Sequence, residues 1–593
     1  MWLLLSIYLF GQIAPIQQES MLCQAESISE KYNLEVAKLP PASPFPKTQD
    51  CLNTASVWFS IDLDELSQNA FVSLKEDQVW NYLRELGVQG VYLKNLKMGG
   101  AFRTGLNVDP KWADGWEDIA IAMQRKGISL ISDSVGNSTG LSTDFSLALK
   151  NVGQYPNLYH LIEVESWDWK YLPKVPQGKW SANIPWLDLQ TLQKKGYVPE
   201  QCSPYVKMSN WNATMQICCA DGVVRRWIYL KENESDPVIN WMSSSFAGSR
   251  IAAADTLNSI YHLGGKVIHI DPEIPSNAQE TLSLWIRKLG GFSLQAGIGL
   301  EGIKNTTSDV TLDTLTGPAL LHALMTEETE ALKLMYRLFL EAGIETKKLV
   351  HMLQPFDKYC SDWTELLKNP KKKFQYYEEL LTGELLRMRL LKEDAIRIGM
   401  GQGATWPNYC KIALNVKDFE KNREEITQMH LLLAFFYAMQ PGTFSFSISD
   451  LLGTLNSDAV NLMEATPNTL YPSLPGQFKN SKSFAMQLQK ILRVRRDNQF
   501  QSGELIAVPQ TLDPGLIILM HRLKSTGQIQ LLAVNFSQHE TSQHLEMSCF
   551  RQTTPIDLMT GLAVKKLFDS SGLDLRLPPL SGKVILLQPK YFQ

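Results

Sequence analysis

Basic residues are not in excess in this sequence, and that balance argues against nucleic acid as a partner. Lys and Arg number 57 against 61 Asp and Glu, which gives a formal net charge of −4. A nucleic-acid-binding surface needs a basic face, which this composition does not supply. The 44% hydrophobic and 20% charged fractions are those of a globular protein. A chain of 593 residues is long enough for about two to four domains.

The sequence also lacks an apolar run long enough to cross a membrane. Residues Met1 to Ala14 are apolar, but a span needs ~20 such residues. The run resembles the h-region of a signal peptide, yet no Lys or Arg precedes Lys31 to form a basic n-region. Cys23 to Ala25 offers a small-residue cleavage site. Two interpretations stay open: a signal segment over residues 1–25 in an exported (periplasmic or extracellular) protein, or an N-terminal helix of a cytoplasmic one.

Cysteine is sparse, and its spacing argues against a zinc site. The chain has eight cysteines, none of them in a C-x-x-C pair, and Cys218 and Cys219 are adjacent. Structural zinc sites built from cysteine need paired ligands at short, regular spacing. Disulfides in an exported protein would be permitted, but their pairing cannot be derived from this spacing.

Short β-like segments alternate with amphipathic helical stretches over residues 56–500, after a Pro-rich and polar linker or arm at 26–55. Repeated alternation predicts parallel strands joined by helices, and eight such units predict an α/β fold with a closed (β/α)8 TIM barrel. The predicted strands are Ser56–Asp62, Val88–Leu93, Ile128–Asp133, Gly265–Asp271, Gly291–Ala296, Asp309–Asp313, Leu349–Leu353 and Gly442–Ile448.

Two segments interrupt this alternation, and the pattern changes at the C-terminus. Residues from about 140 to 237, after the third strand, are rich in Trp, Pro and Asn, which predicts an insert that forms a lid or subdomain over the barrel mouth. Residues from about 358 to 430 are helical and charged, which predicts a solvated helical insert. Period-two runs over residues 501–593 predict an antiparallel β-sandwich domain.

Three motifs outside any catalytic position carry a resemblance to a known family. The motifs are Asn107–Pro110 followed by Trp116, the run Leu431–Thr443, and Gly503–Gln510 with Met520–Leu523 and Val534–Ser537. In this order along the chain, they resemble segments of the α-amylase superfamily (glycoside hydrolase family 13), most closely its trehalose synthase (maltose glucosyltransferase) branch. The resemblance covers residues 56–593 and implies a link to carbohydrate (α-glucoside) metabolism or binding.

The resemblance places Asp271 at the catalytic nucleophile position. Val267 to Asp271 is similar to the family's Phe-Arg-Leu-Asp, with His269 where the family has Arg. A guanidinium that is always charged is thereby replaced by a group that is neutral for much of the time at pH 7. A retaining glycosidase also needs a second carboxyl group about 5 to 5.5 Å from the nucleophile.

The second carboxyl group is missing where the family carries it. The fifth strand, Phe292 to Ala296, has no acidic residue at the matching place. Glu301, a few residues further on, is a candidate for the general acid, and Glu273 is a weaker one. Loss of a general acid removes a contribution of about 10² to 10⁴ in rate.

At the seventh strand, Met352 to Asp357 resembles the family's Leu-x-Asn-His-Asp. Asp357 is then the third carboxylate, and Gln354 stands at a substrate-binding position. A second register, in which Asn415 to Asp418 supplies this motif, stays open.

Asn137 and Ser138 follow the third strand where the resemblance implies Asn-His. Together with His269 and Gln354 they are the candidate substrate-binding residues. Family members often hold a structural Ca²⁺ through the residue at the Asn137 position, but the sequence establishes no ligand set and no other cofactor. The family's Tyr-Asp clamp falls on Gly100 and Ala101.

Two functional hypotheses remain from the sequence. In the first, the barrel is a pseudoenzyme that binds an α-glucoside, a disaccharide or a protein partner as a scaffold without turning sugar over. In the second, it is an active retaining maltose/trehalose glucosyl-transferring isomerase or α-glucosidase that uses Asp271. No Asn-His-Asp or Arg-x-Asp-Ala string occurs anywhere in the chain, which favours the first. The sequence does not indicate an oligomeric state.

Overall fold

The computed structural model divides into two compact units, one within residues 95–114 and 132–291 and the other within 51–94, 115–131 and 292–589. The description covers residues 51, 55–63, 71, 74–97, 108–134, 136–138, 143–153, 155–198, 210–232, 236–241, 255–256, 259–260, 263–297, 299–353, 405–453, 470–546, 550, 555–564 and 572–589.

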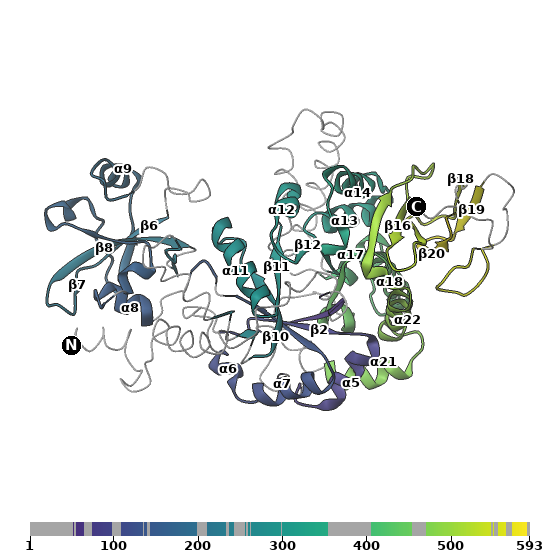
Figure 1. Ribbon diagram of the computed structural model, residues 1–593, viewed down its shortest axis with the longest axis horizontal. Helices are drawn as coiled ribbons and strands as arrows, with labels where there is room; N and C mark the ends of the chain where they lie inside the picture. The colour runs from purple at the N-terminus through teal and green to yellow at the C-terminus, as the bar shows by residue number, and fades with distance from the viewer. Residues whose placement is uncertain are drawn as a thin grey trace. The chain divides into compact units, whose positions relative to one another are not determined.

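Eight parallel strands form a closed barrel in the order β1-β14-β13-β12-β11-β10-β3-β2. Figure 1 labels four of them, β2, β10, β11 and β12. The strands are almost entirely buried, as expected for a parallel sheet that helices cover. Each coincides with one of the eight predicted strands, so the predicted (β/α)8 barrel is confirmed. They are β1 (Val57–Asp62), β2 (Gly90–Lys94), β3 (Ser129–Asp133), β10 (Gly265–Ile270), β11 (Phe292–Ala296), β12 (Val310–Leu312), β13 (Leu349–Met352) and β14 (Thr443–Ser447).

The helix between β1 and β2, α5 (Asp77–Leu86), is amphipathic. It buries Val79, Trp80, Leu83 and Leu86 and ends at Gly87, whose φ of 103° is a left-handed conformation that favours glycine. The other helices between barrel strands or after them are α6 (Pro110–Ala113), α7 (Trp116–Arg125), α11 (Ser276–Lys288), α12 (Gly299–Asn305), α13 (Thr316–Thr326), α14 (Glu330–Ala342), α17 (Trp406–Ala413), α18 (Arg423–Ala438), α19 (Ile448–Leu452), α21 (Leu470–Lys479) and α22 (Phe484–Asp497).

The charged helical segment predicted over 358–430 is only partly described. Residues 358–404 lie outside the described part of the chain. In the described remainder, α17 buries Trp406, Tyr409 and Cys410, and most of α18 is buried as well. The predicted solvated character is therefore wrong for α17, whereas residues 415–425, which lead into α18, are mostly exposed. No helix among the described residues is both long and apolar enough to span a membrane.

The predicted insert after the third strand is confirmed as an antiparallel subdomain. Its sheet has the order β4-β8-β6-β5, with β7 and β9 pairing to β8. One of its cores extends onto Ile268 and Ile270 of β10 and Leu282 of α11. The elements are α8 (Thr143–Leu149), β4 (Leu161–Val164), β5 (Ser181–Asn183), α9 (Trp186–Lys194), β6 (Trp211–Thr214), β7 (Ile217–Cys218), β8 (Val224–Glu232) and β9 (Asp236–Pro237).

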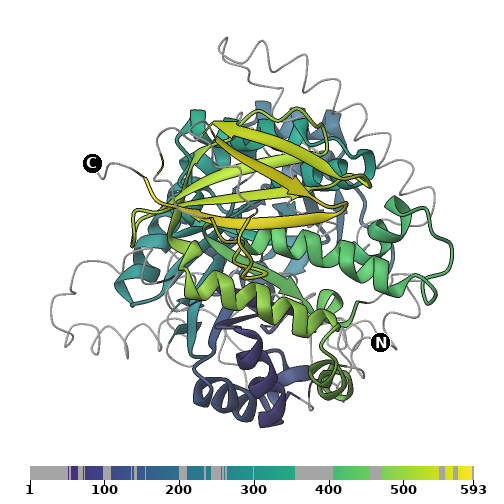
Figure 2. The ribbon, with the colours of Figure 1, turned by 90° about the vertical axis from the view of Figure 1, so that its right-hand side faces the viewer.

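The predicted C-terminal antiparallel β domain is also confirmed, and Figure 2 shows its sheets in yellow and green. The four-stranded sheet has the order β15-β16-β17-β20, and β18 pairs with β19. Both contribute to one core. The strands are β15 (Gly503–Ala507), β16 (Leu516–Leu523), β17 (Ile529–Asn535), β18 (Thr541–Glu546), β19 (Gly572–Leu577) and β20 (Ser581–Leu587).

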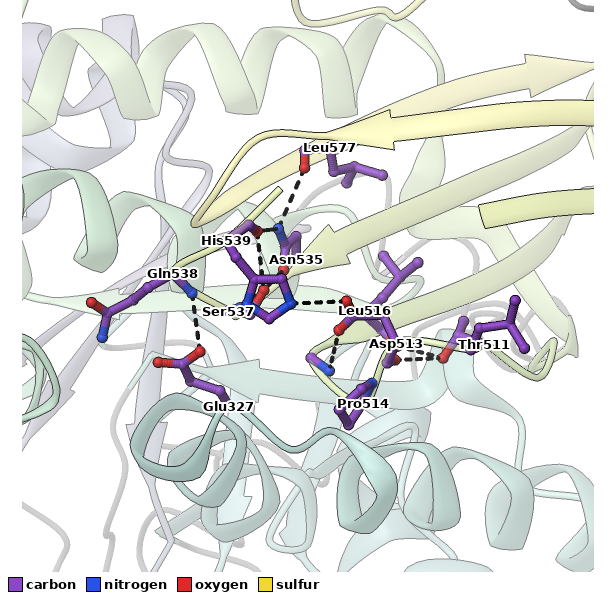
Figure 3. Close-up of polar contacts among 12 residues, drawn as sticks. Glu327, Thr511, Asp513, Pro514, Leu516, Asn535, Ser537, Gln538, His539 and Leu577 are labelled. Carbon is purple, nitrogen blue, oxygen red and sulfur yellow. Dashed lines mark hydrogen bonds and ion pairs between the residues drawn. The ribbon is translucent and has the colours of Figure 1, made fainter. Parts of the chain in front are cut away.

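Polar contacts join this β domain to the turn after α13 (Figure 3). The Glu327 carboxylate accepts the backbone N–H of Gln538 at 3.1 Å. Nε2 of His539 lies 3.0 Å from Oδ2 of Asp513. The hydroxyl of Thr329 donates to the carbonyl of Pro514 at 2.7 Å. The bonds of Glu327 and Thr329 satisfy main-chain groups at the junction, which stabilises the packing of the β domain on α13 and α14. The contact between His539 and Asp513 lies within the β domain.

Candidate active site

Asp271 is the first residue after β10, at the end of a barrel strand where enzymes of this architecture carry their chemistry. Its carboxylate is partly exposed. Oδ1 accepts the backbone N–H of Glu273 at 3.0 Å, and Oδ2 accepts that of Asn137 at 3.4 Å. Both oxygens of the residue at the nucleophile position are therefore hydrogen-bonded to the protein's own main chain.

Gly136 allows the loop after β3 to approach this carboxylate. A Cβ atom placed on Gly136 would lie 3.0 Å from Oδ2 of Asp271, closer than side-chain atoms normally come. Glycine removes that contact because it has no side chain. The loop after β3 thus covers one oxygen of the carboxylate.

His269, which replaces the Arg of the family motif, is bonded to a different carboxylate. Its Nδ1 lies 3.0 Å from Oδ1 of Asp133, the last residue of β3. The backbone N–H of Ser134 also donates to the carbonyl of His269 at 2.7 Å. The exposed fraction of the His269 side chain is 6%, and that of the Asp133 side chain is 37%. The pair joins the ends of two adjacent strands, and Asp133 is a partner that the sequence motif did not reveal.

Asn137 and Ser138 are held by the segment that leads out of the insert. Oδ1 of Asn137 accepts the indole N–H of Trp241 at 3.3 Å, and its carbonyl accepts the N–H of Ile239 at 2.9 Å. Ser138 is 2% exposed and forms a bridge with Val238. The loop that contacts Asp271 is therefore anchored on its other side as well.

These contacts give no support to a calcium ion at Asn137. The amide oxygen that would bind the ion already accepts a hydrogen bond from Trp241. Ca²⁺ takes six to eight oxygen ligands, usually including several carboxylates. Among the described residues there is no group of three or more His, Cys, Asp or Glu side chains that could hold a metal ion.

The end of the fifth barrel strand, β11, presents an amide in place of an acid. Gln295 is 4% exposed, and its Oε1 accepts the hydroxyl of Thr306 at 2.6 Å. Glu301 lies on α12, in the other compact unit, with an exposed side chain that accepts from Nδ2 of Asn305 at 3.2 Å. Glu273 is exposed. The structure joins Glu273 to Asp271 through its main chain only, and Glu301 stays a sequence-based candidate.

The seventh barrel strand is β13, which decides between the two registers proposed for the third carboxylate. Asn415 and Asp418 lie between α17 and α18, and Oδ1 of Asp418 accepts the backbone N–H of Lys421 at 3.3 Å. The register through Asp418 is therefore wrong. Gln354 and Asp357 follow β13 but lie outside the described residues, so their assignment stays a prediction.

A buried His–Asp pair, which the motifs did not single out, lies between β12 and β13. Oδ2 of Asp313 is 2.8 Å from Nδ1 of His351, and both side chains are 1% exposed. The other oxygen, Oδ1, accepts the backbone N–H groups of Leu315 and Thr316 at the start of α13. Burial raises the pKa of Asp313, but the hydrogen bonds from His351 and Thr316 outweigh burial and hold that pKa below its usual value.

His351 is fully engaged by acceptors. Its Nε2 lies 3.1 Å from the carbonyl oxygen of Pro441, which can only accept. Both ring nitrogens of His351 therefore face acceptor oxygens, that of Asp313 at Nδ1 and that of Pro441 at Nε2. The role of this His–Asp pair is structural, because neither side chain reaches solvent.

A buried ion pair supports the loop after β2. Nζ of Lys97 lies 2.8 Å from Oδ1 of Asp255, and the two side chains are 7% and 0% exposed. The same ammonium group donates to the hydroxyl of Ser259 at 2.5 Å. A compact, desolvated pair of this kind positions a loop but offers no group to a ligand.

Solved structures with the α-amylase fold are similar to this one. An α-amylase from Geobacillus thermoleovorans complexed with acarbose has a TM-score of 0.56 at 11% sequence identity, covering 91% of this chain and 99% of that one. A debranching enzyme from Nostoc punctiforme gives 0.55 at 12%, covering 92% and 100%. The trehalose-6-phosphate hydrolase of Bacillus licheniformis gives 0.53 at 10%, covering 90% and 99%.

At these identities the likeness shows the fold alone. No family model matches the sequence, and no curated protein matches it. The resemblance to glycoside hydrolase family 13 is thereby confirmed as a likeness in fold. This chain has the barrel, the insert after the third strand and the C-terminal β domain that its sequence predicted.

Proposed function

We propose that this chain is a catalytically silent protein of the α-amylase fold whose barrel serves an α-glucoside-linked binding role. The observation that carries the proposal is the engagement of Asp271. A glycosidase nucleophile must present a carboxylate oxygen to the sugar carbon that it attacks. In this chain each oxygen of Asp271 accepts a main-chain N–H, and Gly136 packs against one of them.

The surrounding groups support the same conclusion. Gln295 at the end of β11 has no acidic proton to give a leaving group, and its side chain is bonded to Thr306. His269 is bonded to Asp133, so it does not hold Asp271 as a guanidinium would. A retaining mechanism needs both a positioned nucleophile and a general acid. In this chain the residue at the first position, Asp271, is bonded to main-chain N–H groups, and the residue at the second, Gln295, is bonded to Thr306.

The proposed ligand class, an α-glucoside, comes from the resemblance to proteins of the α-amylase fold. One similar structure is an α-amylase complexed with acarbose, and the fold places a polar surface at the ends of the barrel strands. Because the Asp271 carboxylate is hydrogen-bonded to the main chain of neighbouring loops, we propose that this surface binds a sugar without hydrolysing or transferring it.

Sugar turnover tests the catalytic part of the proposal. We expect the full chain, incubated with maltose or with trehalose, to release no glucose and to form no isomer above a protein-free blank, and Asp271→Asn to behave identically. Asp418→Asn, in an exposed turn, is the matched control. If the wild type and Asp418→Asn turn over sugar and Asp271→Asn does not, the protein is an active enzyme and the proposal is refuted.

The stability of an Asp271 variant distinguishes a supporting carboxylate from a catalytic one. We expect Asp271→Ala to lower the free energy of unfolding by about 1 to 2 kcal/mol, because two main-chain N–H groups lose a charged acceptor. Removal of a catalytic carboxylate commonly leaves stability unchanged or raises it. Urea unfolding measures the change, with Glu273→Gln, an exposed neighbour, as the control. An Asp271→Ala variant at least as stable as the wild type would contradict the supporting role.

A further inference from the structure

A cavity of about 80 Å³ lies where the barrel strands β1 and β2 begin. Residues before β1 and β2, the end of α5 and the last turns of α22 line it. A single water needs roughly 10 to 15 Å³ of cavity volume. The cavity is several times larger than that, so it has room for one tetrahedral oxyanion. The whole cavity belongs to one compact unit.

Positive charge dominates its lining. Arg493, Arg495 and Arg496 line the cavity against a single carboxylate, that of Glu85. Arg496 bonds to the neighbouring Asp497 at 3.1 Å on an exposed face. Arg493 is exposed and has no ion pair within the described part of the chain. The guanidinium groups thus exceed the acidic groups around them.

Arg495 is a buried cation without a buried anion. It is 1% exposed, and its Nη1 donates to the carbonyls of Ala438 and Gln440 at 2.6 Å each, while Nη2 donates to that of Gly442. Its Nε has no hydrogen-bond partner among the described residues. Burial lowers the pKa of this guanidinium to about 9. Removing a charge from water is costly unless an opposite charge compensates it, and among the described residues Arg495 has only carbonyl oxygens as partners.

Gln89 adds a neutral donor whose orientation is determined. Its Oε1 accepts both the backbone N–H of Ser56 at 2.8 Å and the hydroxyl of Ser56 at 2.7 Å. This assigns the amide oxygen, so Nε2 is the free end of the side chain. Gln89 lines the cavity, and Nε2 has no acceptor among the described residues. Guanidinium and amide N–H groups around a small cavity are the donors that oxyanions prefer.

We propose that this cavity binds a small oxyanion of the phosphate class, with Arg493 and Arg496 in direct contact, Gln89 donating from Nε2, and Arg495 supplying charge from behind the wall. The anion comes either as free phosphate or as the phosphoryl group of a small sugar phosphate, and both present the same oxygens. The site is independent of the barrel-mouth function proposed above.

Titration of the full chain with inorganic phosphate tests the proposal. At constant ionic strength, calorimetry should show one phosphate per chain, and phosphate should raise the thermal midpoint above that in chloride. Arg493→Ala combined with Arg496→Ala should weaken the dissociation constant at least tenfold. Gln89→Glu, which keeps the oxygen that accepts from Ser56 but replaces the donor by a charge, should weaken it similarly.

Arg125→Ala is the matched control, because Arg125 is exposed on α7 and does not line the cavity. If Arg125→Ala weakens phosphate binding as much as the double variant does, the effect comes from general surface charge, and the proposal is overturned. Equal midpoints in phosphate and chloride would also overturn it. A parallel titration with glucose 6-phosphate separates the two sources: tighter binding than phosphate assigns a sugar phosphate, and weaker or equal binding assigns the free anion.

Discussion

Replacing Gly442 by alanine is expected to lower the free energy of unfolding by more than about 3 kcal/mol. Gly442 has a φ of 89°, in the left-handed region that a side chain disfavours. A Cβ atom would lie 2.2 Å from the carbonyl oxygen of Leu349 and 2.9 Å from that of Thr346. Both obstacles are main-chain atoms, so no rotamer change relieves the contact.

The surroundings of Gly442 make this contact rigid. Its N–H donates to the carbonyl of Gln501 at 2.9 Å, and its carbonyl accepts from Arg495. One residue later β14 begins, and Thr443 is in register with Val350 of β13. Relief of the clash would require β13 and β14 to separate, which would open the barrel.

Gly453→Ala is the control for this measurement. Gly453 also has a left-handed φ, 62°, but nothing lies within 4 Å of the Cβ position. Its substitution should cost only about 1 kcal/mol, from backbone conformation alone. Urea unfolding of the two variants separates the clash from the φ preference. A Gly442→Ala variant that loses no more stability than Gly453→Ala would show that the strand ends can move apart.

Acidification is the second change with a large expected effect, and His521 is its source. This residue of β16 is 0% exposed, and neither ring nitrogen has a hydrogen-bond partner among the described residues. Burial, with a smaller contribution from nearby His351, lowers the pKa of His521 to about 3. An unfolded histidine has a pKa of about 6.5.

The unfolded state therefore binds the additional proton between about pH 6.5 and 3, and the folded state does not. The contribution of His521 to stability is complete above pH 6.5 and is lost as the pH falls through this window. At 1.36 kcal/mol per pH unit, we expect a loss of about 2 to 3 kcal/mol between pH 7 and 4.5. The depressed pKa of Asp313 acts in the same direction at lower pH.

His521→Leu removes the titrating ring and its two unpaired nitrogens at similar volume. We expect the variant to be at least as stable as the wild type at pH 7.5 and to lose about 2 kcal/mol less on transfer to pH 4.5. Denaturant unfolding at the two pH values measures both quantities. If the variant loses as much stability as the wild type, another group is responsible for the acid sensitivity.

The local pattern of the sequence was sufficient for the architecture. Each barrel strand is a short apolar run bounded by turn residues, and the run from Leu431 to Thr443 forms the end of α18 and the start of β14 as predicted. Period-two alternation predicted strands such as β16 and β17. Such patterns can be read from sequence because the periodicity of one element depends on residues a few positions apart.

The candidate site was only partly predictable. Asp271, Asn137 and His269 were identified by position, and the structure brings their loops together. Their partners were not: the family motif implied a nucleophile held by Arg, whereas Asp271 is bonded to main-chain N–H groups and His269 to Asp133. A motif specifies which residue stands at a strand end, but the hydrogen bonds it makes depend on the neighbouring strand.

The sequence by itself determined the order of elements and the closed barrel. Tertiary structure alone decided where charges are buried and what compensates them. Asp313 and His351 are 38 residues apart and meet because β12 and β13 are in register, and Arg495 reaches carbonyls more than 50 residues away. Burial and electrostatic compensation are properties of packing between distant segments, whereas helix and strand formation depends on near neighbours.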